Sequence, residues 1–387
     1  MDRKNGTISV KTFCIILLLL CRPVHAQKAE LSGYVTDMPS TLYVNMPGQT
    51  EWYWENLIHN RLNFGWQMND VWRIDAGMRN RLVAGSSYLV QPEEMSFDKG
   101  RIDASWNLFN TAGRIPSLLN VAVDRFYLTF EKERWKLQLG RQRINWGQTF
   151  VWNPNDIFNA YSFFDFDYPE RPGADAFRGT FFNSETAYTE FAVALNHYGK
   201  ATAALMHHNN IYNTDIQVLA GLIEETDIVV GGAMTSDFNG LNLRIEASVF
   251  QPYSSREDSA ATVAVSVGTD YIFPNSLMLQ AELLYNNTRQ PGNMMSLLNA
   301  SELSAKRLSV SEWNLFAQAS CPVSPRLNAA MSAMYFINIK GLYSGISIDY
   351  SLLENLDISG IIQYFTTTSG HSEMSACLGF IRLKYVF

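Results

Sequence analysis

The stretch Leu241-Asn-Leu-Arg-Ile-Glu-Ala-Ser-Val249 alternates apolar and polar side chains without a break. The same period of two runs from Thr262 to Phe273 and from Gly345 to Leu352. Successive side chains of a β-strand point to opposite faces, so this pattern predicts strands with one apolar face and one wetted face. Because such segments recur along the chain, we predict an all-β fold.

The composition narrows the class of protein. The chain has 387 residues, of which 47% are hydrophobic, 13% aromatic and 17% charged, and its formal net charge is −7. Few charges and many aromatics argue against a disordered chain, and the acidic balance argues against a nucleic-acid partner. The longest apolar run, residues 13–21, is shorter than the roughly 20 residues of a membrane-spanning helix. We therefore expect no nucleic-acid binding and no helical membrane domain.

The amino-terminal segment has the features of a targeting sequence. Basic residues precede the apolar stretch 12–21, and small side chains around Ala26 suit cleavage by signal peptidase. We predict a secretory signal peptide over residues 1–26. Lipid attachment at Cys21 is a weaker alternative, because bulky Leu20 stands where a lipoprotein signal carries a small residue. The chain is therefore expected to act outside the cytoplasm.

Removal of this signal leaves Cys321 and Cys377 as the remaining cysteines. A disulfide between them is an alternative in an oxidising compartment, although one pair does not make a disulfide framework. We interpret both as ordinary wall or turn residues.

The motifs expected of an enzyme are missing from the sequence. It contains no Gly-x-Ser-x-Gly, and His207 and His208 are consecutive, so on a strand they point to opposite sides and cannot chelate together. We predict that the protein is not an enzyme and has no catalytic residue, metal or cofactor. The acidic residues Asp165, Asp167 and Glu170 leave a calcium site as an alternative, but the spacing of a calcium loop is missing, which favours a solvated acidic loop.

Three features favour a membrane barrel over a secreted β-sandwich, the alternative with the same alternation. Aromatic side chains stand at strand ends, as they do at the two membrane interfaces of barrels. The segment Gly379–Phe387 places Tyr385 and Phe387 on its apolar face and resembles the assembly signal of bacterial outer-membrane barrels. Connections alternate between short and long. We predict a transmembrane antiparallel up-and-down β-barrel of about 18 strands, with 16 as the alternative.

The loop lengths also orient the predicted strands. Short turns fall on one side of the barrel when the strands are followed backwards from Phe387, and long segments fall on the other: 143–173, 251–260, 287–311 and 366–375. Short periplasmic turns and long external loops are the rule for outer-membrane barrels. We assign residues 51–387 to the barrel and residues 27–50 to a periplasmic lead or a partial plug.

Polar side chains on the inward parity are expected to line an aqueous lumen, because a charge facing lipid costs about 2–4 kcal/mol near the membrane midplane. The predicted pore-lining residues are Arg61, Arg79, Arg81, Arg125, Lys136, Arg178, Arg244 and Glu246. Arginines in the first third of the chain would attract an anionic solute such as a carboxylate. For Arg244 and Glu246, the alternative to lining the pore is that the two side chains pair with each other.

These features together predict a function. We expect an outer-membrane porin for passive, partly selective diffusion of small hydrophilic solutes. A transporter of hydrophobic solutes and a barrel for export or assembly of a surface polymer are the alternatives. The expected partners are outer-membrane lipid, the barrel assembly machinery and small solutes, and the oligomeric state stays open.

The long segment from Arg143 to Gly173 is rich in aromatic residues. So many aromatics would form a large exposed patch in water, which predicts that the loop folds into the lumen and sets the constriction. Its predicted functional residues are Arg141, Arg143, Trp146, Trp152, Asp156, Asp165, Asp167 and Arg171. Arg141 and Arg178 stand at the two ends of the loop and are expected to pair with its carboxylates. An external lid that binds a surface partner is the alternative.

Residues 139–175 also carry a resemblance to a known family. Gly140-Arg141-Gln142, Trp146-Gly147, Asn153-Pro154 and Arg171-Pro172-Gly173-Ala174 occur in that order. The pattern resembles porin-like outer-membrane proteins of the alginate-export type and their uncharacterised relatives. The resemblance implies a barrel in the bacterial outer membrane and leaves the solute open.

Overall fold

The computed structural model describes residues 29–86, 106–111, 117–159, 163–164, 170–171, 173–253, 260–287, 304–369 and 372–387. The predicted signal peptide, residues 1–26, lies outside this part of the chain. Within these ranges the regular structure consists of strands, and they contain no helix long and apolar enough to span a membrane.

The described residues form 19 strands. The first nine are β1 (Ala29–Met46), β2 (Gln49–Gln67), β3 (Trp72–Gly85), β4 (Trp106–Thr111), β5 (Ser117–Lys132), β6 (Trp135–Gln142), β7 (Ala174–Phe182), β8 (Ala187–Leu195) and β9 (Ala201–Ile211). The others are β10 (Thr214–Ile223), β11 (Asp227–Phe238), β12 (Leu241–Pro252), β13 (Thr262–Ile272), β14 (Met278–Asn286), β15 (Trp313–Ser324), β16 (Leu327–Phe336), β17 (Gly341–Leu353), β18 (Leu356–Ser369) and β19 (Ser372–Val386).

Eighteen of these strands form a closed antiparallel barrel, which confirms the predicted fold class and the larger of the two strand counts. Each strand of the ring pairs with the next one in the chain, except that β3 skips β4 and pairs with β5. The short strand β4 pairs with the N-terminal part of β5, residues 117–121, on its other edge. The ring closes where β1 pairs with β19. There the backbone amide of Gly33 donates to the Phe387 carbonyl at 2.9 Å, and the Phe387 amide donates to the Gly33 carbonyl at 3.0 Å.

The expectation for residues 27–50 is wrong, because most of this segment is a barrel strand. β1 pairs with β2 along its full length and with β19 on its other edge. Pro39 has no amide proton for a ladder, and the β1–β19 pairing skips this residue. Pro39 and the polar residue Asp37 interrupt the apolar alternation of β1, so the sequence did not indicate a strand here. The barrel nevertheless needs β1 to close.

The lengths of the connections separate the two ends of the barrel, as predicted, except that segment 366–375 belongs mostly to β18 and β19 and is not a long connection. One end carries only short turns in the described chain, such as 183–186, 212–213 and 239–240. At the other end, long segments join β6 to β7, β12 to β13 and β14 to β15. By the rule for outer-membrane barrels, the short turns define the periplasmic end.

The two faces of the wall follow the alternation of the sequence. In β12, Val249 is exposed on the outer face, whereas Glu246 and Ser248 are buried inside. One irregularity reverses this parity. A β-bulge in β5 leaves Asp124 as an extra residue between Val123 and Arg125, so Asp124 and Arg125 both contribute to the interior. Cys321 and Cys377 are both free thiols.

Candidate pore and its inward-folded loop

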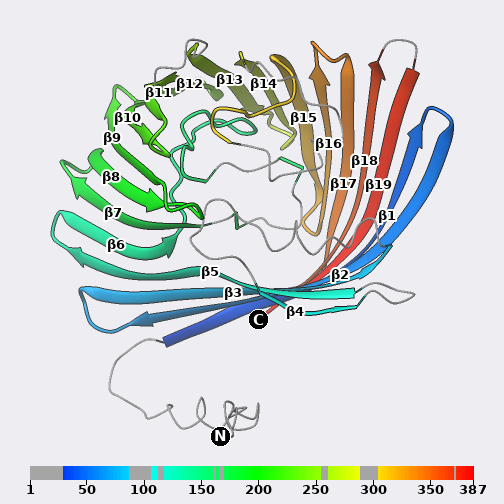
Figure 1. Cartoon of the computed structure of the whole chain (residues 1–387), viewed down its shortest axis with the longest axis horizontal. Helices are drawn as coiled ribbons and strands as arrows, with labels where there is room; N and C mark the ends of the chain where they lie inside the picture. Colours follow the sequence, from blue (N-terminus) through cyan, green and yellow to red (C-terminus); the bar gives the residue numbers. More distant parts are fainter. Residues whose placement is uncertain are drawn as a thin grey trace, which may run out of the picture.

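The segment that follows β6 lies inside the ring of strands, as predicted (Figure 1, teal). Ile144, Trp146, Val151 and Trp152 are each at most 4% exposed and belong to the apolar cluster in the barrel interior. Residues 143–159 therefore form an inward-folded loop. This burial removes the aromatic side chains from water, which is the physical reason for the fold of the loop.

Glu246, on β12, holds the first part of the inward-folded loop. Its carboxylate accepts backbone hydrogen bonds from Gln148 at 2.6 Å, from Thr149 at 3.2 Å and from Asn155 at 2.6 Å. The Thr149 hydroxyl adds a fourth contact at 3.3 Å. The side chain of Glu246 is fully buried. The prediction that Glu246 lines the pore is therefore wrong, because the loop covers this carboxylate.

Glu282, on β14, holds the next three residues in the same way. Its carboxylate accepts from the backbone amides of Phe150, Val151 and Trp152 at 2.9, 3.0 and 2.8 Å. The Ser266 hydroxyl donates to it at 2.8 Å. Two wall carboxylates therefore bind six backbone N–H groups of the loop. Sequence reasoning missed this role of Glu282, although its inward parity was readable from the alternation.

Glu190, on β8, binds a side chain of the loop. Trp146 donates its indole N–H to Glu190 at 2.5 Å, while Arg178 and Thr180 contact the second carboxylate oxygen at 2.6 and 3.2 Å. Gln217, on β10, donates to the Trp146 carbonyl at 2.8 Å. Arg178 therefore orients a wall carboxylate toward the loop, instead of pairing with a carboxylate of the loop as expected.

Arg141 also has a different partner from the one expected. Its guanidinium forms two hydrogen bonds of 2.8 Å with Asp175, on β7, and donates to the Val123 carbonyl at 2.8 Å. Val123 lies on the edge of β5 between the parts that pair with β4 and with β6. Arg141 therefore provides a hydrogen-bond donor for the Val123 carbonyl, which pairs with neither β4 nor β6. Its role in this structure is to stabilise the wall at this gap in the pairing.

Aromatic side chains join the loop to the far wall. Trp152 packs edge-to-face on Phe316 with ring centroids 6.5 Å apart, and Arg244 lies 4.4 Å over the ring of Phe150. Further along the chain, Phe163 contacts Phe316, and Phe164 contacts Tyr343, with centroid separations of 5.0 and 4.9 Å. Arg244 also faces Asp270 at 3.5 Å, so its ion-pair partner in the structure is Asp270.

A second inward segment, residues 304–311, was not foreseen from the sequence (Figure 1, yellow). Ala305, Leu308 and Val310 are buried in the same apolar cluster as the inward-folded loop. Lys306 forms an ion pair of 2.8 Å with Asp227, on β11, which ties the segment to the wall. The three apolar residues of this segment were the one sequence feature that could have indicated its burial.

The predicted arginine ladder is organised around one acidic residue. Arg61 and Arg79 contact the same oxygen of Asp124 at 2.9 and 3.4 Å. All three side chains are buried, so Arg61 and Arg79 do not face open lumen as predicted. Arg125 donates to the backbone carbonyls of 170 and 171 at 2.8 and 2.7 Å and so holds the far end of the long connection.

The remaining predicted residues lie in several places. Arg81, on β3, contacts Asn120 at 3.4 Å, and Lys136, on β6, faces Glu131 at 3.5 Å. Arg171 has a left-handed backbone with φ of 59° at the end of the long connection. Asp165 and Asp167, and with them the calcium alternative, lie outside the described residues.

Asp156 is buried within the inward-folded loop. Burial raises the pKa of its carboxyl to about 8, and this effect outweighs the attraction of the Arg143 guanidinium, which lowers the pKa. The group is therefore largely protonated at neutral pH. A neutral carboxyl costs less free energy to bury than a charged one.

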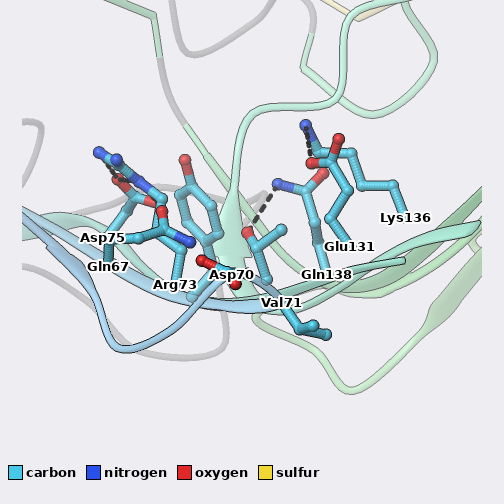
Figure 2. Close-up of a pocket in the computed structure, with 10 residues that line it drawn as sticks. Gln67, Asp70, Val71, Arg73, Asp75, Glu131, Lys136 and Gln138 are labelled. Atoms are coloured by element: carbon cyan, nitrogen blue, oxygen red, sulfur yellow. Dashed lines mark hydrogen bonds and ion pairs between the residues drawn. The ribbon is translucent and has the colours of Figure 1, made fainter. Parts of the chain in front are cut away.

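Below the loop, the periplasmic end of the barrel contains a pocket of about 490 Å³ (Figure 2). Its lining comes from β2, β3, β5, β6 and the turn between β2 and β3. Two ion pairs face it, Arg73 with Asp75 at 2.9 Å and Lys136 with Glu131. The wall of this pocket therefore offers charges of both signs to a polar solute.

No protein-family model and no curated protein matches the sequence. The structure is similar to solved structures of Pseudomonas aeruginosa proteins, among them the outer membrane protein OprD. OccK9 (OpdG) has a TM-score of 0.58 at 8% identity, with 93% of this chain and 99% of that chain covered. OprD has a TM-score of 0.54 at 9% identity, with 92% and 94% covered.

OccK2 (OpdF) in complex with glucuronate gives a TM-score of 0.56 at 8% identity, with 93% and 98% covered. At these identities the likeness establishes the fold alone, which is a closed antiparallel barrel of 18 strands. It supports a porin-like barrel and gives no support to the resemblance to the alginate-export type.

Proposed function

We propose that the protein is an outer-membrane porin through which small hydrophilic solutes diffuse, and that the inward-folded loop narrows its passage. The observation that carries this proposal is the attachment of the loop by Glu246 and Glu282, on the wall opposite its root. A loop fixed across a lumen in this way limits the size of a solute that can pass. The outward apolar face of the wall suits an integral position in lipid.

An anionic solute is the class that the charges favour. Arg61 and Arg79 share the single carboxylate of Asp124, and Arg81 and Arg125 lie close by in β3 and β5. This sector of the described wall therefore brings several guanidinium groups together on neighbouring strands. A guanidinium binds a carboxylate in a forked geometry, and the glucuronate bound by the structurally similar OccK2 carries such a group. Small organic acids, including sugar acids, are our proposed solutes.

Electrical recording in a planar bilayer tests the proposal. The purified barrel should show single-channel conductance, and a KCl gradient should give a reversal potential displaced toward the anion. Phe150→Ala, which removes aromatic bulk from the loop, should raise the conductance. Phe126→Ala is the matched control, because Phe126 is 61% exposed on the outer face and should leave conductance unchanged.

The alternatives give different results in the same experiment. A transporter of hydrophobic solutes or a closed barrel for polymer assembly would be nearly silent electrically. Cation selectivity would overturn the proposed solute class while leaving the channel itself intact.

A further inference from the structure

The outer face of the barrel carries polar side chains on three neighbouring strands. Asp37 on β1, Asn56 and Asn60 on β2, and Asn80 on β3 all fall on the outward parity of their strands. Asp37 is exposed and pairs in register with Ile58, which is 38% exposed. Asn60 and Asn80 stand opposite each other in the β2–β3 pairing. We call these four residues the outer polar patch.

The middle of the patch, at Asn60, lies at the depth of the hydrocarbon core. Asn60 is midway between Trp54 and Trp66 on the same face of β2, and tryptophans at strand ends mark the two membrane interfaces. On the far side of the barrel (Figure 1), the middle of the outer face is apolar, as at Ile245 in β12 and Val267 in β13. The patch is therefore a local departure from the lipid-facing surface of the described wall.

The hydrogen bonds within the wall leave the patch incompletely satisfied. Asn80 donates to the Asn60 side-chain oxygen at 3.1 Å, and Asn60 donates to the Tyr34 carbonyl at 3.1 Å. Asp37 forms no hydrogen bond or ion pair within the described chain, and the side-chain oxygen of Asn56 is buried without a partner there. Polar groups in hydrocarbon without hydrogen-bond partners cost free energy. A second molecule that supplies hydrogen bonds to the patch would therefore form a stabilised complex with the barrel.

We infer that a second copy of this chain covers the outer polar patch. The patch contains a carboxylate acceptor, Asp37, and amide donors, Asn56, Asn60 and Asn80, so one copy offers what the next one needs. Copies inserted in the same orientation also carry the patch at the same depth in the bilayer. Rotation about the membrane normal brings two such patches together without moving either in depth, as closed symmetry requires.

Cross-linking in native membranes tests this inference independently of any channel activity. In a background of Cys321→Ala and Cys377→Ala, Asn60→Cys is treated with a short membrane-permeant bis-maleimide. Products at whole-number multiples of the chain mass are expected. Val267→Cys is the matched control, because Val267 faces outward at mid-depth across the barrel, and it should stay monomeric.

A second variant separates the polar contact from simple proximity. Adding Asp37→Leu to Asn60→Cys should lower the cross-linked fraction about tenfold, the equivalent of one hydrogen bond to a charged group. Heat-modifiable gel mobility verifies that each variant is a folded barrel. Absence of the product, equal yield from Val267→Cys, or no effect of Asp37→Leu would overturn the inference. A product whose mass is not a multiple of the chain would also overturn it, and would point to a different membrane protein.

Discussion

Glu282→Ala removes the acceptor for three consecutive backbone amides of the inward-folded loop, those of Phe150, Val151 and Trp152. Glu282 is 1% exposed, so these contacts are made away from bulk water. Loss of a partner for a buried donor costs about 1–3 kcal/mol, and three donors therefore lose about 3–9 kcal/mol before water enters. The Glu246 contacts stay in place. We expect the middle of the loop to detach while its start stays anchored.

Two measurements report this detachment. Limited proteolysis of the folded barrel should cut the variant within the loop at least about tenfold faster, since each 1.4 kcal/mol of lost stability changes the open population tenfold. Single-channel recordings should show larger and noisier conductance. Gln280→Ala is the control, because Gln280 lies on the same strand and parity, and within the described residues its side chain hydrogen-bonds to Gln318 and not to the loop. If Glu282→Ala behaves like Gln280→Ala in both assays, the carboxylate does not hold the loop and this reasoning is refuted.

Three further outcomes are expected. Deleting Phe387 removes two backbone hydrogen bonds that join β1 to β19 and should reduce the amount of heat-modifiable barrel in the membrane; normal levels would contradict this. Asp124→Asn leaves Arg61 and Arg79 buried without their shared charge and should destabilise the barrel by about 3–5 kcal/mol in chemical denaturation; an unchanged midpoint would count against the pairing. Because the pKa of Asp156 is raised to about 8, its protonated form favours the packed loop, and this contribution falls as pH rises from about 4 to 8. Asp156→Asn does not titrate, so its protease resistance should change less between about pH 4 and pH 8 than that of the parent. An unaltered pH profile would refute the assignment of this pH dependence to Asp156.

Much of the fold could be predicted because it depends on a periodic physical constraint. Every residue of a membrane barrel wall faces either lipid or the interior, so the alternation in Leu241–Val249 specifies both the strand and its two faces. Loop lengths then sort the two ends of the barrel. Repeating this pattern around the ring gave the approximate strand count, although β1 was not among the strands expected.

Local exceptions to the period could not be predicted. The bulge at Asp124 reverses the inward parity within β5, and nothing in the alternation marks where it occurs. It also hides the acid that pairs with Arg61 and Arg79, which made the arginines look unopposed. β1 was missed for a related reason, since Pro39 and Asp37 break its apolar face.

The inward fold of the loop could be predicted from its aromatic side chains, but its attachment could not. The expectation paired wall arginines with loop carboxylates. In the structure the negative groups are on the wall and the donors are on the loop, because wall carboxylates bind the backbone N–H groups of the loop. Backbone donors have no sequence signature, so Glu246 and Glu282 resembled ordinary pore-lining acids. Only the path of the loop in space distinguishes these roles.

The junction between β1 and β19 has a consequence for the folding kinetics of the barrel. Hairpins such as β9–β10 join residues that are adjacent in sequence, whereas the junction pairs Tyr34 with Val386. Bringing such distant segments together carries the largest loop-closure entropy in the molecule and should be the slow step. Until that step, both strands expose an edge of unpaired backbone, which is prone to aggregation in water and costly in lipid. Once formed, the junction reopens only by losing the hydrogen bonds of its ladder, and exposing those backbone groups in lipid is costly, which protects the closed barrel.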